Sequence, residues 1–117
     1  MNIRETTAGE QIRRKYKRYI TDGSVSLQGK TSGGFGVLVN LGRGGVLIRS
    51  DSLCPQVGDE YAFRFTVRGF ERELEAGGII VGGHSNLLAM QFLKEPPGLE
   101  SVLDFMEQSH YPWTGAN

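Results

Sequence analysis

The 117-residue sequence lacks the features that define several common classes of protein. Its single cysteine, Cys54, cannot form a disulfide within the chain. No apolar run approaches the ~18–20 residues of a membrane-spanning helix. The first ten residues, MNIRETTAGE, contain no apolar stretch of the kind found in a secretory signal. We therefore expect one domain in the cytoplasm, with no membrane span.

Residues with catalytic or metal-binding chemistry are also sparse. His84 and His110 have no Cys, His or carboxylate neighbour at the spacing of metal ligands. Cys54 precedes Pro55 in a turn-like segment, which favours a packed thiol over a nucleophile. Residues 29–31, GKT, end like a phosphate-binding P-loop, but the glycine that this motif requires at position 24 is a serine. These absences predict a protein that is not an enzyme and has neither a metal nor a resident cofactor.

The chain has no net charge, yet its charges are unevenly distributed. The formal charge at pH 7 is zero. Residues 1–20 carry six basic and two acidic side chains, whereas residues 21–117 carry seven basic and eleven acidic ones. A basic arm of this kind indicates an anionic partner. The alternative is a solvated arm that is held by the acidic remainder of the chain.

Glycine is in excess, with 17 residues grouped between short β-type segments. This arrangement is typical of tight turns and bulges in a small all-β domain. The segment 99–108 has apolar residues at spacings of three and four, which predicts a helix. The basic stretch QIRRKYKRY (11–19) shows neither the alternation of a strand nor the apolar spacing of a helix. We therefore interpret it as a loop that becomes ordered on binding. Strands are predicted over 25–28, 35–41, 46–49, 61–67, 70–76 with a continuation to 81, and 88–92.

These elements predict an all-β fold, namely a six-stranded antiparallel β-barrel with a C-terminal α-helix. Closing the sheet into a barrel would also hide its edge strands. We expect residues 1–10 to be a flexible N-terminus, residues 11–108 to form the single domain, and residues 109–117 to be a C-terminal tail.

Two elements of the sequence carry binding chemistry. The first is the arm with Arg13, Arg14 and Arg18, whose guanidinium groups suit phosphates and the acceptor edge and face of guanine. The second is the turn NLGRGG (40–45). Here Asn40 can both donate to and accept from a base edge, and the glycines let a ligand approach the backbone. Together they fit a small molecule with two guanines and two phosphates. Arg43, within this turn, is expected to point to solvent.

With both motifs in this order, the sequence resembles the PilZ domain family over residues 11–108. The RxxxR motif of that family is matched by Arg14 and Arg18, and its [DN]xSxxG motif by Asn40 and Gly45. The serine of the second motif is replaced by Gly42. The resemblance implies a six-stranded antiparallel barrel that binds cyclic di-GMP. The ligand-binding residues that it implies are Arg13, Arg14, Arg18, Asn40, Gly42 and Gly45.

The resemblance also sets the expectations for function. It implies a receptor or adaptor that changes conformation on binding this second messenger and signals to an unidentified downstream protein. An arginine at the position of Arg13 goes with binding of an intercalated ligand dimer. Gly42 removes one hydroxyl contact, so we expect weakened binding that Gly42→Ser would tighten.

The alternative is a degenerate PilZ-like domain that does not bind cyclic di-GMP and acts as a protein–protein interaction module. A nucleic-acid partner is not expected. The outward-facing residues of the segment 61–67, and the residue directly after it, lack the aromatic side chains on which bases stack. These residues are Arg64, Thr66 and Arg68.

Overall fold

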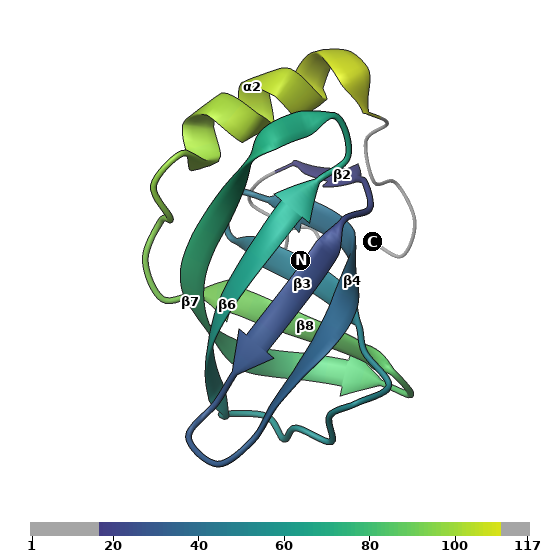
Figure 1. The fold of residues 1–117 in the computed structure, drawn as a ribbon, viewed down its shortest axis with the longest axis vertical. Coiled ribbons are helices and arrows are strands. Elements are labelled where there is room, and N and C mark those ends of the chain that lie inside the picture. Colours follow the sequence, from purple (N-terminus) through teal and green to yellow (C-terminus); the bar gives the residue numbers. More distant parts are fainter. Residues whose placement is uncertain (1–16, 111–117) are drawn as a thin grey trace, which may run out of the picture.

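The computed structural model describes residues 17–110, which form one closed β-barrel and a helix (Figure 1). The six predicted strands and the predicted helix are confirmed, and a further short strand, β2, precedes them. The predictions for residues 1–10, for the tail after His110, and for Arg13 and Arg14 lie outside the described residues. The elements are β2 (Arg18–Ile20), β3 (Ser24–Gln28), β4 (Gly33–Gly42), β5 (Gly45–Arg49), β6 (Glu60–Val67), β7 (Phe70–His84), β8 (Leu87–Phe92) and α2 (Leu99–Ser109).

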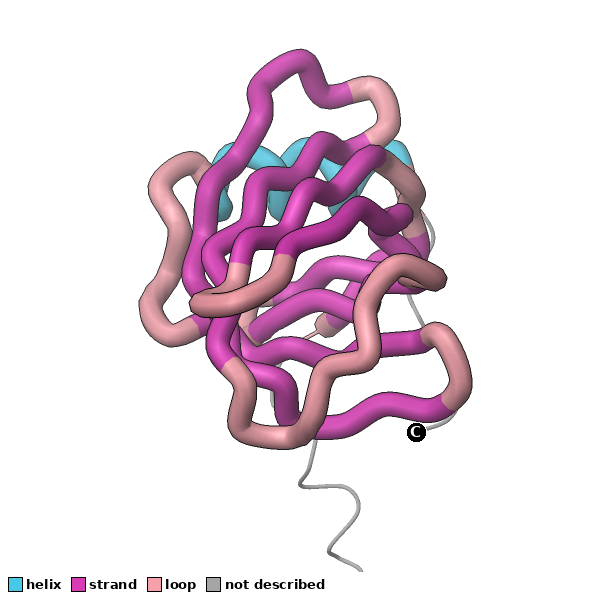
Figure 2. The backbone as a smooth tube through the Cα atoms, turned by 60° about the horizontal axis from the view of Figure 1, so that its bottom comes forward, coloured by secondary structure: helices cyan, strands magenta, loops and turns pink. Residues whose placement is uncertain are grey.

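Every strand pairing in the barrel is antiparallel. Neighbouring strands follow the order β4-β3-β6-β7-β8-β5, and β5 pairs with β4 to close the ring, which Figure 2 shows as a tube. β2 also pairs with β4, and it continues the line of β3 along that strand, with Ile20 opposite Asn40 and Ser24 opposite Val37. The interpretation of 11–19 as a loop is therefore wrong at Arg18 and Tyr19, which belong to a strand.

The core fills the interior of the barrel and extends to the helix at one end. Its centre holds stacked aromatic rings, with Phe63 and Phe65 at a centroid distance of 5.6 Å and Phe92 within 6.5 Å of both. α2 lies across the end of the barrel beside the β6–β7 hairpin (Figure 1), and its Phe105 packs on Phe70 at 5.4 Å. The helix residues that are fully buried against the barrel are Leu99, Val102 and Met106.

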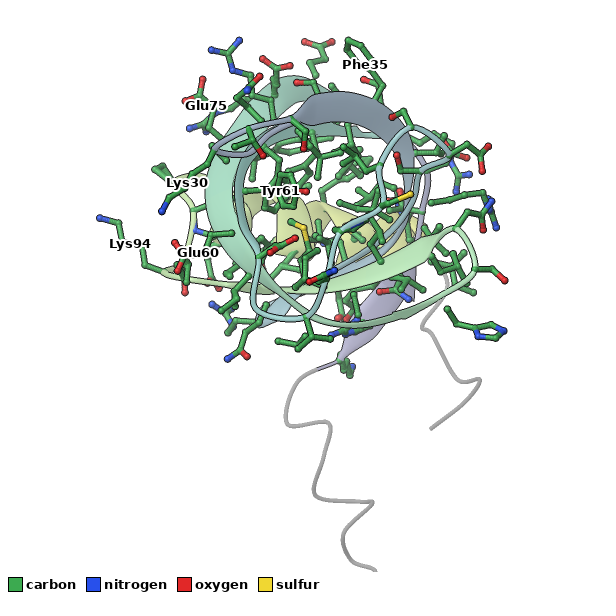
Figure 3. All side chains as sticks on the ribbon, turned by 90° about the horizontal axis from the view of Figure 1, so that it is seen from below. Lys30, Phe35, Glu60, Tyr61, Glu75 and Lys94 are labelled. Atoms are coloured by element: carbon green, nitrogen blue, oxygen red, sulfur yellow. The ribbon has the colours of Figure 1, made fainter. Side chains whose placement is uncertain are left out.

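The second half of β4 contains a bulge that reverses its facing pattern. Phe35 is 74% exposed, and Figure 3 shows it pointing away from the ring of strands. Leu38 and Leu41 are both in the core, although they are three residues apart. The extra residue comes from the irregularity between Leu38 and Asn40, where the register with β5 shifts. Because of this bulge, Asn40 lies on the outer side of the sheet, next to β2, instead of in the core.

Candidate ligand-binding site

Arg18 and Asn40 meet on the outer face of the barrel, where β2 pairs with β4. Arg18 Nη1 donates a hydrogen bond of 3.1 Å to Asn40 Oδ1, and this contact joins the two sequence motifs. The strand register places Arg18 opposite Gly42 and Ile20 opposite Asn40. Asn40 is almost fully buried, so the bond is partly shielded from water. A charged donor in such a setting makes a stronger bond than a neutral one.

This bond also fixes which end of the Asn40 amide can meet a ligand. A guanidinium group can only donate, so the oxygen of the amide must face Arg18. The NH2 group is then the end of the side chain that remains for an acceptor. The acceptors on the edge of guanine are O6 and N7.

Gly42 lies beside the start of β2 at a distance that leaves no room for a side chain. A Cβ atom built on Gly42 would lie 2.6 Å from the carbonyl oxygen of Lys17 and 2.9 Å from Cγ of Arg18. The glycine of the motif turn is therefore required by the pairing of β2 with β4. The sequence pattern indicated only the loss of a serine hydroxyl and did not indicate this packing role.

Gly45 occupies an equally tight position at the start of β5. A Cβ atom there would lie 2.1 Å from the carbonyl oxygen of Met90 on β8. Gly45 pairs with Gln91 in the β5–β8 ladder, and it is buried. Its position in the motif therefore coincides with a point where two strands of the barrel approach closely.

The opposite face of β2 is attached to the helix. The Tyr19 hydroxyl donates a hydrogen bond to Glu107 of α2, and Lys17 Nζ lies 3.5 Å from Glu107 Oε2. Burial raises the pKa of Tyr19 to about 12, and the hydrogen bond to Glu107 and its charge act in the same direction. The Tyr19 hydroxyl, and next the Lys17 ammonium, hold the pKa of Glu107 below its ordinary value. No motif in the sequence signalled this attachment.

Arg43 is not directed freely to solvent, contrary to the expectation from the sequence. Its guanidinium donates to Glu100 in the first turn of α2 at 2.7 Å and to Glu95 at 3.2 Å. A surface hollow of about 290 Å³ is lined by Arg43, by Lys17 and Tyr19, and by three residues of α2. The motif turn is thus tied to the start of the helix, while β2 is tied to its end.

The rest of the described surface contains a larger hollow but no metal-binding cluster. A groove of about 820 Å³ lies over β3 and β6, between Phe35 and the segment 94–97, and none of the predicted site residues line it. Within residues 17–110, no three His, Cys, Asp or Glu side chains are grouped so that they could hold a metal ion. Over the same range, no helix has the length and apolar character needed to cross a bilayer.

A closed six-stranded antiparallel β-barrel with a C-terminal helix is the fold of a PilZ domain. The PilZ domain family matches residues 12–107, and the chain belongs to this family. No curated protein sequence matches it.

Two solved structures have a similar fold at 18% sequence identity. The inhibitor of motility from Bacillus subtilis (MotI/DgrA) superposes with a TM-score of 0.69. The match covers 83% of this chain and 51% of the Bacillus chain, so this chain spans about half the length of that protein. The PilZ domain of YcgR from Escherichia coli, solved with c-di-GMP, has a TM-score of 0.64, with 83% of this chain and 90% of that chain covered.

Proposed function

We propose that this protein is a non-enzymatic receptor for cyclic di-GMP. The observation that supports it best is the 3.1 Å bond between Arg18 and Asn40, because it brings both family motifs to one point on the barrel. Membership of the PilZ family supports the choice of ligand. The compartment that goes with a bacterial second messenger is the cytoplasm, and we place the function there.

In this proposal the ligand lies on the outer face of the barrel over the β2–β4 pair. The amide nitrogen of Asn40 donates to a guanine edge, and the Arg18 guanidinium donates to a phosphate or a guanine. Arg14 and Arg13, which lie outside the described residues, would complete the basic arm, and Arg13 goes with a ligand dimer. The dianionic ligand is attracted to the arm, which carries most of the excess positive charge.

The signal to a downstream protein would leave through α2. β2 carries Arg18 on one face and Tyr19 on the other. Tyr19 and Lys17, the residue before the strand, both contact Glu107. A ligand that moves Arg18 therefore also acts on residues in contact with the helix. We propose that the altered position of α2 is what an unidentified partner protein recognises.

Isothermal titration calorimetry with cyclic di-GMP tests the proposal directly. Arg18→Ala and Asn40→Ala each remove one side of the central pair, and each should weaken binding by about 10- to 100-fold, the value of a charge-assisted hydrogen bond. Arg64→Ala is the matched control, because Arg64 is an exposed arginine on β6 that is paired with Glu75 at 3.2 Å. It should bind like the wild type.

An interaction module without a ligand gives the opposite pattern. The wild type would then release no heat with cyclic di-GMP at concentrations up to about a millimolar, and Arg18→Ala would leave function in the cell intact. Either result would rule out ligand sensing through this site.

A further inference from the structure

We propose that Gly42 is a positioning residue, whose missing side chain allows β2 to close on β4 and so holds Arg18 against Asn40 before a ligand arrives. The inference deepens the proposed function and depends on it for the effect on ligand affinity. The effect on β2 is independent of any ligand.

The first step is steric. The atom nearest to a Cβ on residue 42 is a backbone carbonyl oxygen, that of Lys17, at 2.6 Å. A flexible side chain could rotate away from such a contact, but this carbonyl belongs to the residue directly before β2 and moves with the backbone that leads into the strand. Any residue other than glycine at position 42 therefore pushes β2 off β4.

The second step concerns what holds β2 in place. Apart from the side-chain contacts of Arg18 and of the buried Tyr19, it is held by its backbone pairing. It has three residues, and among the described strands it pairs with β4 alone. The Thr21 amide, just past its end, donates to Val39 at 3.2 Å. The barrel is closed by the other six strands, so loss of β2 leaves the ring intact. A side chain at position 42 should therefore release β2 without unfolding the domain.

The third step gives the consequence for the site. When β2 leaves β4, Arg18 loses its fixed place beside Asn40, and Tyr19 loses its fixed place beside Glu107. A serine at position 42 would supply the hydroxyl of the family motif, worth up to about tenfold in affinity. The same serine would displace the arginine, whose charge-assisted contacts contribute more. The expectation from the sequence, that Gly42→Ser tightens binding, is therefore replaced by the expectation that it does not.

The test combines hydrogen exchange without ligand and calorimetry with cyclic di-GMP on Gly42→Ala and Gly42→Ser. The matched controls are Gly82→Ala and Gly82→Ser, because a Cβ on Gly82 of β7 has no atom within 4 Å. Exchange at the amides of residues 18–21 should become at least about tenfold faster in both Gly42 variants and stay unchanged in the Gly82 variants. Amides in β6 and β7 should keep their protection in all four proteins. Gly42→Ala should bind at least about tenfold more weakly than the wild type, and Gly42→Ser no more tightly.

Several outcomes would overturn the inference. Unchanged exchange of residues 18–21 in Gly42→Ala would refute the steric step, whether or not the protein binds the ligand. Tighter binding by Gly42→Ser would refute the third step. Global unfolding of Gly42→Ala would refute the claim that the effect is confined to β2. A wild type that does not bind cyclic di-GMP would refute the proposed function, while the exchange data would still decide the role of Gly42.

Discussion

Removing one hydroxyl group from β2 should measurably loosen the attachment of the helix. Tyr19→Phe keeps the buried ring, which is 6% exposed, and deletes the hydrogen bond to Glu107. A bond to a charged acceptor contributes about 1.5–3 kcal/mol when it is well shielded. Glu107 is 56% exposed, so we expect a loss near 1 kcal/mol, which corresponds to a fall in Tm of roughly 4 °C or more.

The pH dependence of this loss follows from the two pKa shifts. The pKa of Tyr19 is raised from 10.0 to about 12, so its contribution to stability is complete below pH 10 and is lost as the pH rises towards 12. The pKa of Glu107 is lowered from 4.5, so its contribution is present above that pH and is lost as the pH falls through the lower value. The difference between wild type and Tyr19→Phe should therefore be constant from about pH 5 to pH 9 and shrink on both sides.

Urea unfolding of the wild type, Tyr19→Phe, Glu107→Ala and the double variant measures the coupling, because each single variant removes one partner of the bond. Tyr61→Phe is the control, because Tyr61 is equally buried and its hydroxyl has no hydrogen bond to a described residue; Figure 3 shows it inside the ring of strands. A coupling energy near 1 kcal/mol is expected. A value under about 0.3 kcal/mol, or equal effects of Tyr19→Phe and Tyr61→Phe, would show that this hydrogen bond does not help to hold the helix.

Two further substitutions separate packing from surface charge. Gly45→Ala forces a Cβ atom against the Met90 carbonyl and should lower the free energy of unfolding by about 1–3 kcal/mol in urea titrations; a change below about 0.5 kcal/mol would mean that β5 can move off β8 freely. Arg43→Gln breaks the exposed ion pairs with Glu95 and Glu100 and should lower the free energy of unfolding only slightly, and less still in 1 M NaCl; a loss as large as that of Gly45→Ala that does not depend on salt would contradict a surface electrostatic role.

The short-range patterns of the sequence were sufficient to predict the barrel strands and the helix. Alternation over 61–67 matches β6, in which Tyr61, Phe63, Phe65 and Val67 are all buried. The spacing of three and four over 99–108 matches α2. Both are local signals, since each depends on the geometry of a single element facing one core.

β2 could not be predicted in this way. It has three residues and no apolar period of its own. It becomes a strand because its backbone pairs with residues of β4 that lie about twenty positions later in the chain. The exposure of Phe35 and the direction of Asn40 were equally hidden, because they follow from a bulge that appears only when β4 pairs with β5. The attachment of Tyr19 to Glu107 joins residues 88 positions apart.

The sequence by itself determined the class of fold and the two motifs, because periodicity and the chemistry of arginine, asparagine and glycine are properties of short segments. Only the tertiary structure decided that Arg18 touches Asn40, that Gly42 has no room for a side chain, and that α2 is joined to the same strand. Each of these is a contact across strands or between strand and helix. Such contacts depend on register and on distances of a few tenths of an ångström, which no short segment encodes.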